Sequence, residues 1–267
     1  MQTTSAGLTM LGSDVAALLP KRHHAEWTVS PAAFKGYPAT RLSNGQRSFV
    51  LLTDSGHTTL TVPEPDSVTS LTIEGTAPTA VASAAMRSLL PRIDHHINSR
   101  PGLRQRQVRR QHLSEIKALL RARDIAAREF NRPGDITGLS WQHCDTTTTV
   151  TLHALSATGT LSFRGNLAAL ERVIVPFLPP HPGPGCVRSR PPHGCGGVAR
   201  RLLASFPHAV EADQDGLVRF ADTDGGPLQG WVMPRTVNSP ASPLTPVTAG
   251  ICGAGIDLML SALSTIA

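Results

Sequence analysis

Residues 58–75 read TTLTVPEPDSVTSLTIEG, and residues 148–165 read TTVTLHALSATGTLSFRG. The two segments align without a gap at an offset of ninety positions. Five aligned positions carry identical residues, those of Thr58, Thr59, Thr61, Leu71 and Gly75. Each segment alternates apolar and hydroxyl-bearing residues, turns, and alternates again, which is the pattern of two half-buried strands. The alignment predicts an internal repeat, and the alternative is chance recurrence in a threonine-rich chain.

A stretch with helical periodicity follows each of these segments. Thr76 and Asn166 are the predicted N-caps of the two helices, because short polar side chains accept hydrogen bonds from the first free backbone N–H groups. Pro91 and Pro179 are predicted to close the helices, since proline lacks the N–H that would continue them. Each unit therefore reads strand–strand–helix.

The expected fold is α+β. Two related strand–strand–helix units, at about residues 45–92 and 136–178, share an antiparallel sheet core and are joined by a long basic amphipathic helix at 101–131. Together with the amino-terminal residues they form a domain over 1–178. Six prolines and five glycines make residues 179–197 a predicted linker. Residues 198–267 are expected to form a small C-terminal region with a hairpin and a terminal apolar helix.

The positive charge of the chain is concentrated in one segment. Hydrophobic residues make up 40% and charged residues 16% of the chain, which is typical of a folded protein. The net charge is +6, yet residues 100–133 alone hold ten of the 25 arginines and lysines and only three acids. Arginine outnumbers lysine 22 to 3, a bias that is typical of a GC-rich bacterial genome. The basic character is thus a local property of the predicted joining helix.

Five cations fall on one flank of that predicted helix. At about 100° per residue, they lie beside an apolar face centred on Ile116. The five are Arg106, Arg110, Lys117, Arg121 and Arg128. They would form a line about 33 Å long that can contact nucleic-acid phosphates or an acidic protein surface. The alternative is a solvated helix face without a partner, and Arg109 and Arg123 fall on the apolar face instead.

The sequence predicts a non-catalytic binding protein without a cofactor. A self-associating interaction protein, forming a homo-oligomer, is the first alternative, and a small enzyme whose site is not readable from the sequence is the second. The motifs of P-loop, dinucleotide-binding and zinc-peptidase sites are absent from the sequence. Four residues of one loop are weak candidates for a zinc site, although their spacing differs from that of paired structural ligands. They are His181, Cys186, His193 and Cys195.

A cytoplasmic location is expected. The amino-terminal residues lack the charged and apolar regions of a secretory signal. The four cysteines are too scattered to predict a disulfide framework. Asp257 lies in the apolar stretch at 249–267, where a carboxylate opposes membrane insertion, so a buried terminal helix is expected and no membrane partner.

Overall fold

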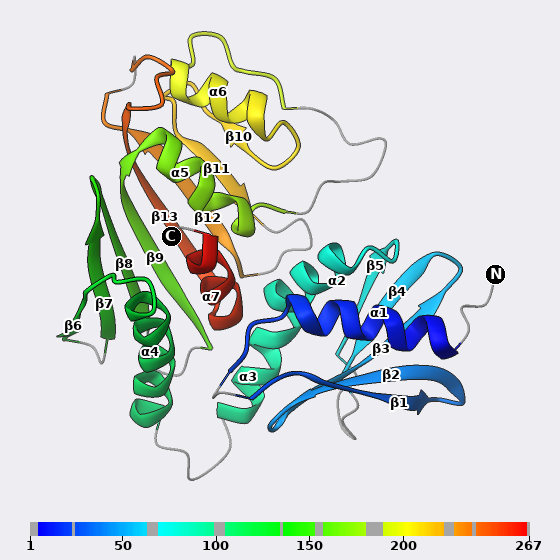
Figure 1. Cartoon of the computed structure of the whole chain (residues 1–267). Helices are drawn as coiled ribbons and strands as arrows, with labels where there is room; N and C mark the ends of the chain where they lie inside the picture. Colours follow the sequence, from blue (N-terminus) through cyan, green and yellow to red (C-terminus); the bar gives the residue numbers. More distant parts are fainter. Residues whose placement is uncertain are drawn as a thin grey trace. The chain divides into compact units, whose positions relative to one another are not determined.

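The structure is a computed structural model of the chain (Figure 1). It describes residues 5–22, 25–62, 69–98, 105–133, 136–152, 157–179, 189–221, 227–236 and 239–265. The chain divides into unit 1, Met1–Leu103, and unit 2, Arg104–Ala267. Each unit has its own antiparallel sheet together with helices, which confirms the α+β class. The expected single sheet shared by both repeats is wrong, because their strands pair within two separate sheets.

Unit 1 contains a five-stranded meander in which each strand pairs with the next along the chain. Its strands are β1 (Thr28–Phe34), β2 (Tyr37–Asn44), β3 (Arg47–Asp54), β4 (His57–Thr61) and β5 (Ser70–Glu74). Two-residue turns at Lys35-Gly36 and Ser55-Gly56 hold all four residues at positive φ. This is the geometry of type I′ hairpins, and it fixes the register of the strands that they join.

The helices of unit 1 come from both ends of the unit. α1 (Ser5–Leu18) packs on the sheet and on α2 (Pro78–Ala84), and α2 continues through a π-helical turn, Ala85–Leu89, into α3 (Leu90–Asn98). The prediction that Pro91 closes this helix is wrong, because Pro91 lies inside α3. A proline has no N–H for the hydrogen bond to the preceding turn, and the π-helical turn just before it relieves that mismatch.

Unit 2 contains an eight-stranded antiparallel sheet with the order β10-β11-β12-β13-β9-β8-β7-β6. The first half of the sheet along the chain is β6 (Ala127–Arg132), β7 (Ile136–His143), β8 (Thr146–Leu152) and β9 (Thr158–Asn166). The second half is β10 (Glu211–Ala212), β11 (Val218–Ala221), β12 (Gln229–Pro234) and β13 (Pro246–Gly255). The two halves join where β13 pairs with β9.

Helices cover one face of this sheet (Figure 1). They are α4 (Gln105–Arg121), α5 (Leu167–Ile174) with a short 3-10 turn at Val175–Phe177, α6 (Gly197–Ser205) and α7 (Ile256–Thr265). Leu139, Val150, Leu161 and Ile251 are buried on the covered face, one from each of four neighbouring strands. The predicted N-cap at Asn166 is confirmed, since its Oδ1 accepts a hydrogen bond of 2.9 Å from the Ala169 N–H. The predicted N-cap at Thr76 is wrong, because Ala77 is the N-cap of α2 and no described side chain caps that helix.

The predicted helix over 101–131 is wrong beyond Arg121. The Ile125 N–H donates to the Leu120 carbonyl and the Asp124 N–H donates to the Arg121 carbonyl, both at 3.0 Å. Asp124 has a φ of 57°. These features make a Schellman C-cap, in which the left-handed position is filled by aspartate in place of the usual glycine. The chain then enters β6, so Arg128 is a strand residue.

The residues after 197 are part of the larger sheet and not a separate appendage. β10 to β13 supply half of its strands, and the pairing of β13 with β9 crosses the predicted linker at 179–197. The expected terminal helix is present as α7, where Asp257 is only 1% exposed. Within the described ranges, no helix is both long enough and apolar enough to cross a membrane.

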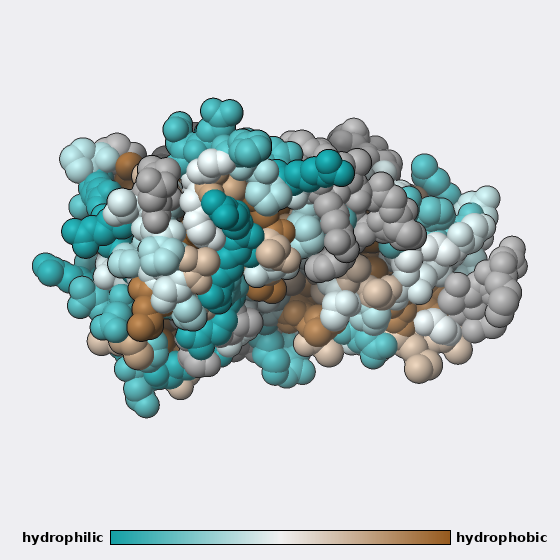
Figure 2. All heavy atoms as spheres, turned by 90° about the horizontal axis from the view of Figure 1, so that it is seen from above, coloured by the Kyte–Doolittle hydropathy of each residue, from teal (hydrophilic) through white to brown (hydrophobic). Residues whose placement is uncertain are grey.

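Both quoted segments form an antiparallel strand pair followed by a helix. In unit 1 these elements are β4, β5 and α2, and in unit 2 they are β8, β9 and α5. Figure 2 shows one face of the molecule, on which the coloured hydrophobic residues form small patches among hydrophilic ones.

Candidate functional site

The five predicted cations are divided between a helix and a strand. Arg110 and Arg121 are exposed on α4, and Lys117 is half-buried between them. Arg106 belongs to α4, but its side chain lies outside the described part of the structure. Arg128 is exposed on β6. The line on α4 therefore runs from Arg110 to Arg121, about 16 Å at about 1.5 Å per residue, which is half the predicted length.

The described cations of this group make no ion pair with any described residue. The opposite side of α4 explains why the helix holds this orientation. Its buried residues recur at helical spacing and face the sheet and α7: Arg109, His112, Leu113, Ile116 and Leu120. Lys117 and Arg121 line a shallow hollow of about 310 Å³ together with Asp124. The basic flank of α4 thus ends beside the start of β6.

The two arginines predicted on the apolar face have structural roles in unit 2. Arg123 donates two hydrogen bonds from its guanidinium, to the Leu263 carbonyl at 3.2 Å and to the Ser264 carbonyl at 3.1 Å. It thereby satisfies backbone acceptors at the carboxyl end of α7. Arg109 is 3% exposed and lies in the buried side of α4. Neither arginine belongs to the surface that a partner would contact.

The predicted zinc candidates are not brought together among the described residues. His181 and Cys186 lie outside the described residues. His193 is exposed and Cys195 is buried. No group of three or more histidine, cysteine or acidic side chains fit for a metal ion occurs in the described part of the chain.

The face of the larger sheet that the helices leave open carries a second set of polar and charged side chains. One row of directly paired residues crosses all eight strands. From β10 to β6, the row is Glu211, Arg219, Trp231, Gly250, Ser162, Thr149, Ser140 and Arg128. Its side chains are exposed or half-exposed, apart from the buried Gly250. The chain runs from the basic flank of α4 through its C-cap directly into β6. Arg128, at the β6 end of this row, therefore follows that flank closely in the sequence.

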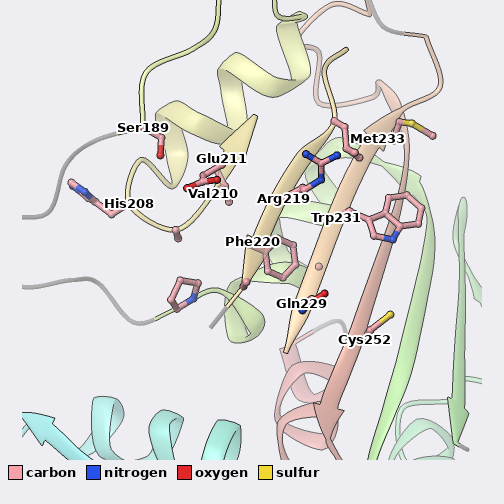
Figure 3. Close-up of a pocket in the computed structure, with 15 residues that line it drawn as sticks. Ser189, His208, Val210, Glu211, Arg219, Phe220, Gln229, Trp231, Met233 and Cys252 are labelled. Atoms are coloured by element: carbon pink, nitrogen blue, oxygen red, sulfur yellow. The ribbon is translucent and has the colours of Figure 1, made fainter. Parts of the chain in front are cut away.

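Trp231 and Met233 are the large exposed hydrophobic residues of β12, with exposures of 36% and 48%. They line an open cavity of about 850 Å³ at the β10–β13 end of the sheet. Figure 3 shows the Trp231 ring over the strands near Met233 and Arg219, while His208 and Ser189 lie apart from them on the other side of the cavity. Arg219 is paired with Asp213 at 3.3 Å. Two aromatic residues, the exposed Trp231 and the buried Phe220, line the cavity together with charged and amide groups.

A second hollow, of about 700 Å³, is lined by Arg164, Arg235 and Thr248. Thr248 pairs directly with Met233 of the first cavity and with Arg164. The two hollows therefore adjoin across β12 and β13. Asp145 also lines this hollow, but no described residue forms an ion pair with Arg164 or Arg235.

Sequence reasoning missed Trp231, Arg164 and Arg235. The segment QGWVMP at 229–234 alternates in burial, with Gln229, Trp231 and Met233 on the exposed side. A tryptophan at the polar positions of an alternating strand was the available signal. Only the pairing of β9, β13 and β12 shows that Arg164 lies near this strand.

Glu26 and Arg201 have clearly shifted pKa values, and both shifts come from ion pairs near the surface. The hydrogen bond and charge of Lys21 lower the pKa of Glu26. The hydrogen bond from Arg201 to Glu171 raises the pKa of Arg201. This second pair is bidentate, with two bonds of 2.7 Å, and it ties α6 to α5. Both pKa shifts are therefore explained by ion pairs between surface side chains.

Comparison of the chain with models of protein families, with curated proteins and with solved structures gave no match. The functional argument for this chain therefore depends on its own residues.

Proposed function

We propose that this chain is a non-catalytic binding protein that contacts nucleic-acid phosphates through the basic flank of α4 and the adjoining strand β6. The observation that carries the proposal is the line of Arg110, Lys117 and Arg121, which make no ion pair with any described residue. A helix that needs only solubility usually has acids interspersed on such a flank. Guanidinium and ammonium groups in a row suit the regularly spaced phosphates of a polyanion.

The charge distribution between the units supports this proposal. Unit 2 contains 17 of the 25 arginines and lysines and 12 of the 19 acids, whereas unit 1 contains eight and seven. The excess positive charge therefore belongs to the unit that carries α4. An acidic protein surface would satisfy the same cations, so the test must separate these two partners.

The test is a titration of fluorescent duplex DNA at about 50 and 200 mM salt. Three phosphate contacts predict a slope of about −3 for the logarithm of the association constant against the logarithm of the salt concentration. A fourth contact from Arg128 makes this slope steeper by about 0.9. Combined charge reversal, Arg110→Glu, Lys117→Glu and Arg121→Glu, is expected to abolish binding. Arg172→Glu on α5 is the control, because this exposed arginine lies on a different helix.

Two results would overturn the proposal. One is the absence of duplex binding by the wild-type protein at the lower salt concentration. The other is unchanged binding by the triple variant when its circular dichroism and melting temperature match those of the wild type. Polyglutamate is the matched probe for an acidic protein surface. Binding of polyglutamate without binding of DNA would indicate that the partner is an acidic protein and not a nucleic acid.

We also infer that the two strand–strand–helix segments, β4–β5–α2 in unit 1 and β8–β9–α5 in unit 2, arose by duplication of one ancestral segment. The pairing of β4 with β5 supports this, because Thr58 pairs with Ile73 and the residues ninety positions later, Thr148 and Phe163, pair in the same way. The four neighbouring pairs keep the same offset. A cytoplasmic location stays a prediction, which the scattered cysteines support.

A further inference from the structure

The Trp231 side chain is held across its neighbouring strand. Trp231 pairs with Gly250, and a Cβ atom at Gly250 would lie only 2.6 Å, 2.7 Å and 2.9 Å from three atoms of the indole. The ring therefore occupies the space above Gly250 that a side chain would fill. The Gly250 backbone packs against the indole and fixes it on the open face, and Trp231 is still 36% exposed. A fixed, exposed aromatic ring is a surface on which a nucleic-acid base can stack.

Two arginines lie beyond Met233, toward one end of this ring along β12. Arg235 follows Trp231 by four residues, about 13 Å at about 3.3 Å per residue of extended chain. Arg164 lines the same hollow as Arg235, and neither makes an ion pair with a described residue. Any anion in this hollow would be held by these guanidinium groups, which suit phosphate oxygens.

The amino terminus of α5 borders this hollow, but its N–H groups are already used. The Leu167 N–H donates to Thr245, the Ala168 N–H to Pro243, and the Ala169 N–H to Asn166. The helix terminus therefore offers no free donors to an anion at these three positions. The side chains of Arg164 and Arg235, together with the Thr248 hydroxyl, are the groups that can hold an anion in this hollow. Asp145 also lines it and is the opposing charge, which the two arginines outnumber.

Hydroxyl-bearing side chains extend the open face from Trp231 to β6. The row continues through Ser162, Thr149 and Ser140 to Arg128, five strand spacings or about 24 Å from Trp231. On β6, the Arg132 guanidinium lies 4.9 Å from the centre of the Phe130 ring. The face therefore has an aromatic residue near both ends, each close to cations that form no ion pair with a described residue, and polar groups lie between the ends.

We propose that this open face binds single-stranded nucleic acid, with a base stacked on Trp231 and neighbouring phosphates held by Arg164 and Arg235. The bases of a duplex are stacked on one another, so an indole on a sheet face contacts only an unpaired base. Trp231 and Met233 are the exposed large hydrophobic residues of β12 on this face, and the rest of its paired row is mostly serine, threonine and arginine. That is a small apolar area for the core of a protein interface. The inference rests on the proposed function for the choice of a nucleic acid, but it uses a different set of residues.

The experiment titrates the full chain with a labelled oligothymidylate of about 12 nucleotides and with a duplex of equal length. Trp27 and Trp141 are 8% and 3% exposed, so Trp231 is the tryptophan that a bound base can quench. The wild-type protein is expected to bind the single strand with saturable quenching. Trp231→Ala is expected to weaken this binding about tenfold or more, and Trp231→Phe to restore part of it.

The charge variant tests the phosphate contacts. Arg164→Glu together with Arg235→Glu is expected to weaken binding of the single strand. The slope of log affinity against log salt concentration is expected to become less steep by about 1.4. Arg172→Glu is again the control and is expected to bind like the wild type. The proposal is overturned by wild-type protein that fails to bind the single strand, or by folded Trp231→Ala protein that binds it as tightly as the wild type does.

The triple α4 variant separates this inference from the proposed function. If the variant binds the duplex as the wild type does while single-strand binding still requires Trp231, the proposed function fails and the inference stands. If the duplex binds through α4 but the single strand does not quench Trp231, only the inference fails. Quenching by polyglutamate and not by oligothymidylate overturns the inference in favour of an acidic protein segment.

Discussion

Arg123 and Leu263 connect the end of α4 to the end of α7 through a hydrogen bond of 3.2 Å from the guanidinium to the Leu263 carbonyl. A second bond, of 3.1 Å, reaches the next carbonyl, that of Ser264. The carboxyl end of a helix carries unsatisfied acceptors and partial negative charge, which a cation stabilises. The turn that ends α4 therefore contributes to the stability of a helix about 140 residues later in the chain.

Replacement of this cation tests that contribution. Arg123→Met is expected to lower the free energy of unfolding by about 1–2 kcal/mol, because two charge-assisted bonds are lost. Urea denaturation followed by circular dichroism measures the change. Arg121→Met is the matched control, since Arg121 is exposed at the same helix end, and its effect is expected to stay within about 0.5 kcal/mol. Equal effects of the two variants would contradict the capping role.

Asp94 is the shared carboxylate of a buried ion cluster in unit 1. It lies 3.0 Å from the Arg47 Nε and 3.5 Å from an Arg22 guanidinium nitrogen, and all three side chains are buried. Asp94→Asn leaves two buried arginines without their shared negative partner. The free energy of unfolding, measured by chemical denaturation, is therefore expected to fall by about 3–5 kcal/mol. Asp14→Asn on the exposed side of α1 is the control. A loss below about 1 kcal/mol would show that the cluster tolerates a neutral partner.

Glu26 provides a pH prediction at the surface of unit 1. Lys21 lies 2.5 Å from the Glu26 carboxylate and lowers its pKa. A lowered pKa in the folded state means that the pair stabilises the fold above the ordinary glutamate pKa, and that this contribution is lost as the pH falls through the lowered value. An NMR titration of Glu26 measures the shift. In Lys21→Met the pKa is expected to return toward its ordinary value, and an unchanged pKa would remove Lys21 as the cause.

Gly250 tests how the indole of Trp231 is held. A methyl group at this position would collide with the ring, so Gly250→Ala is expected to displace the indole from the sheet. Acrylamide quenching of tryptophan fluorescence is expected to increase, because the two other tryptophans are buried. Ser162→Ala on the neighbouring strand is the control. Unchanged quenching in a folded Gly250→Ala protein would show that the ring does not depend on this glycine.

The secondary structure of the repeat could be predicted from local pattern. Alternation at 58–61 and 148–152, followed by a helical period, identifies strands and helices because side-chain direction depends on residue spacing alone. The Asn166 N-cap was likewise predictable, since a cap uses only groups three residues apart. The end of α4 was not, because the left-handed residue there is an aspartate, and the helical period continues past it by coincidence.

The sequence by itself thus determined the α+β class, the strand–strand–helix order and the local excess of positive charge. Tertiary structure alone decided that the strands divide into two sheets and that β13 closes onto β9. It also decided that Arg128 lies in one row with Trp231, from segments about a hundred residues apart. The physical reason is that long-range hydrogen bonding and burial decide which strands pair. The alternation within a strand decides only which of its two faces is buried.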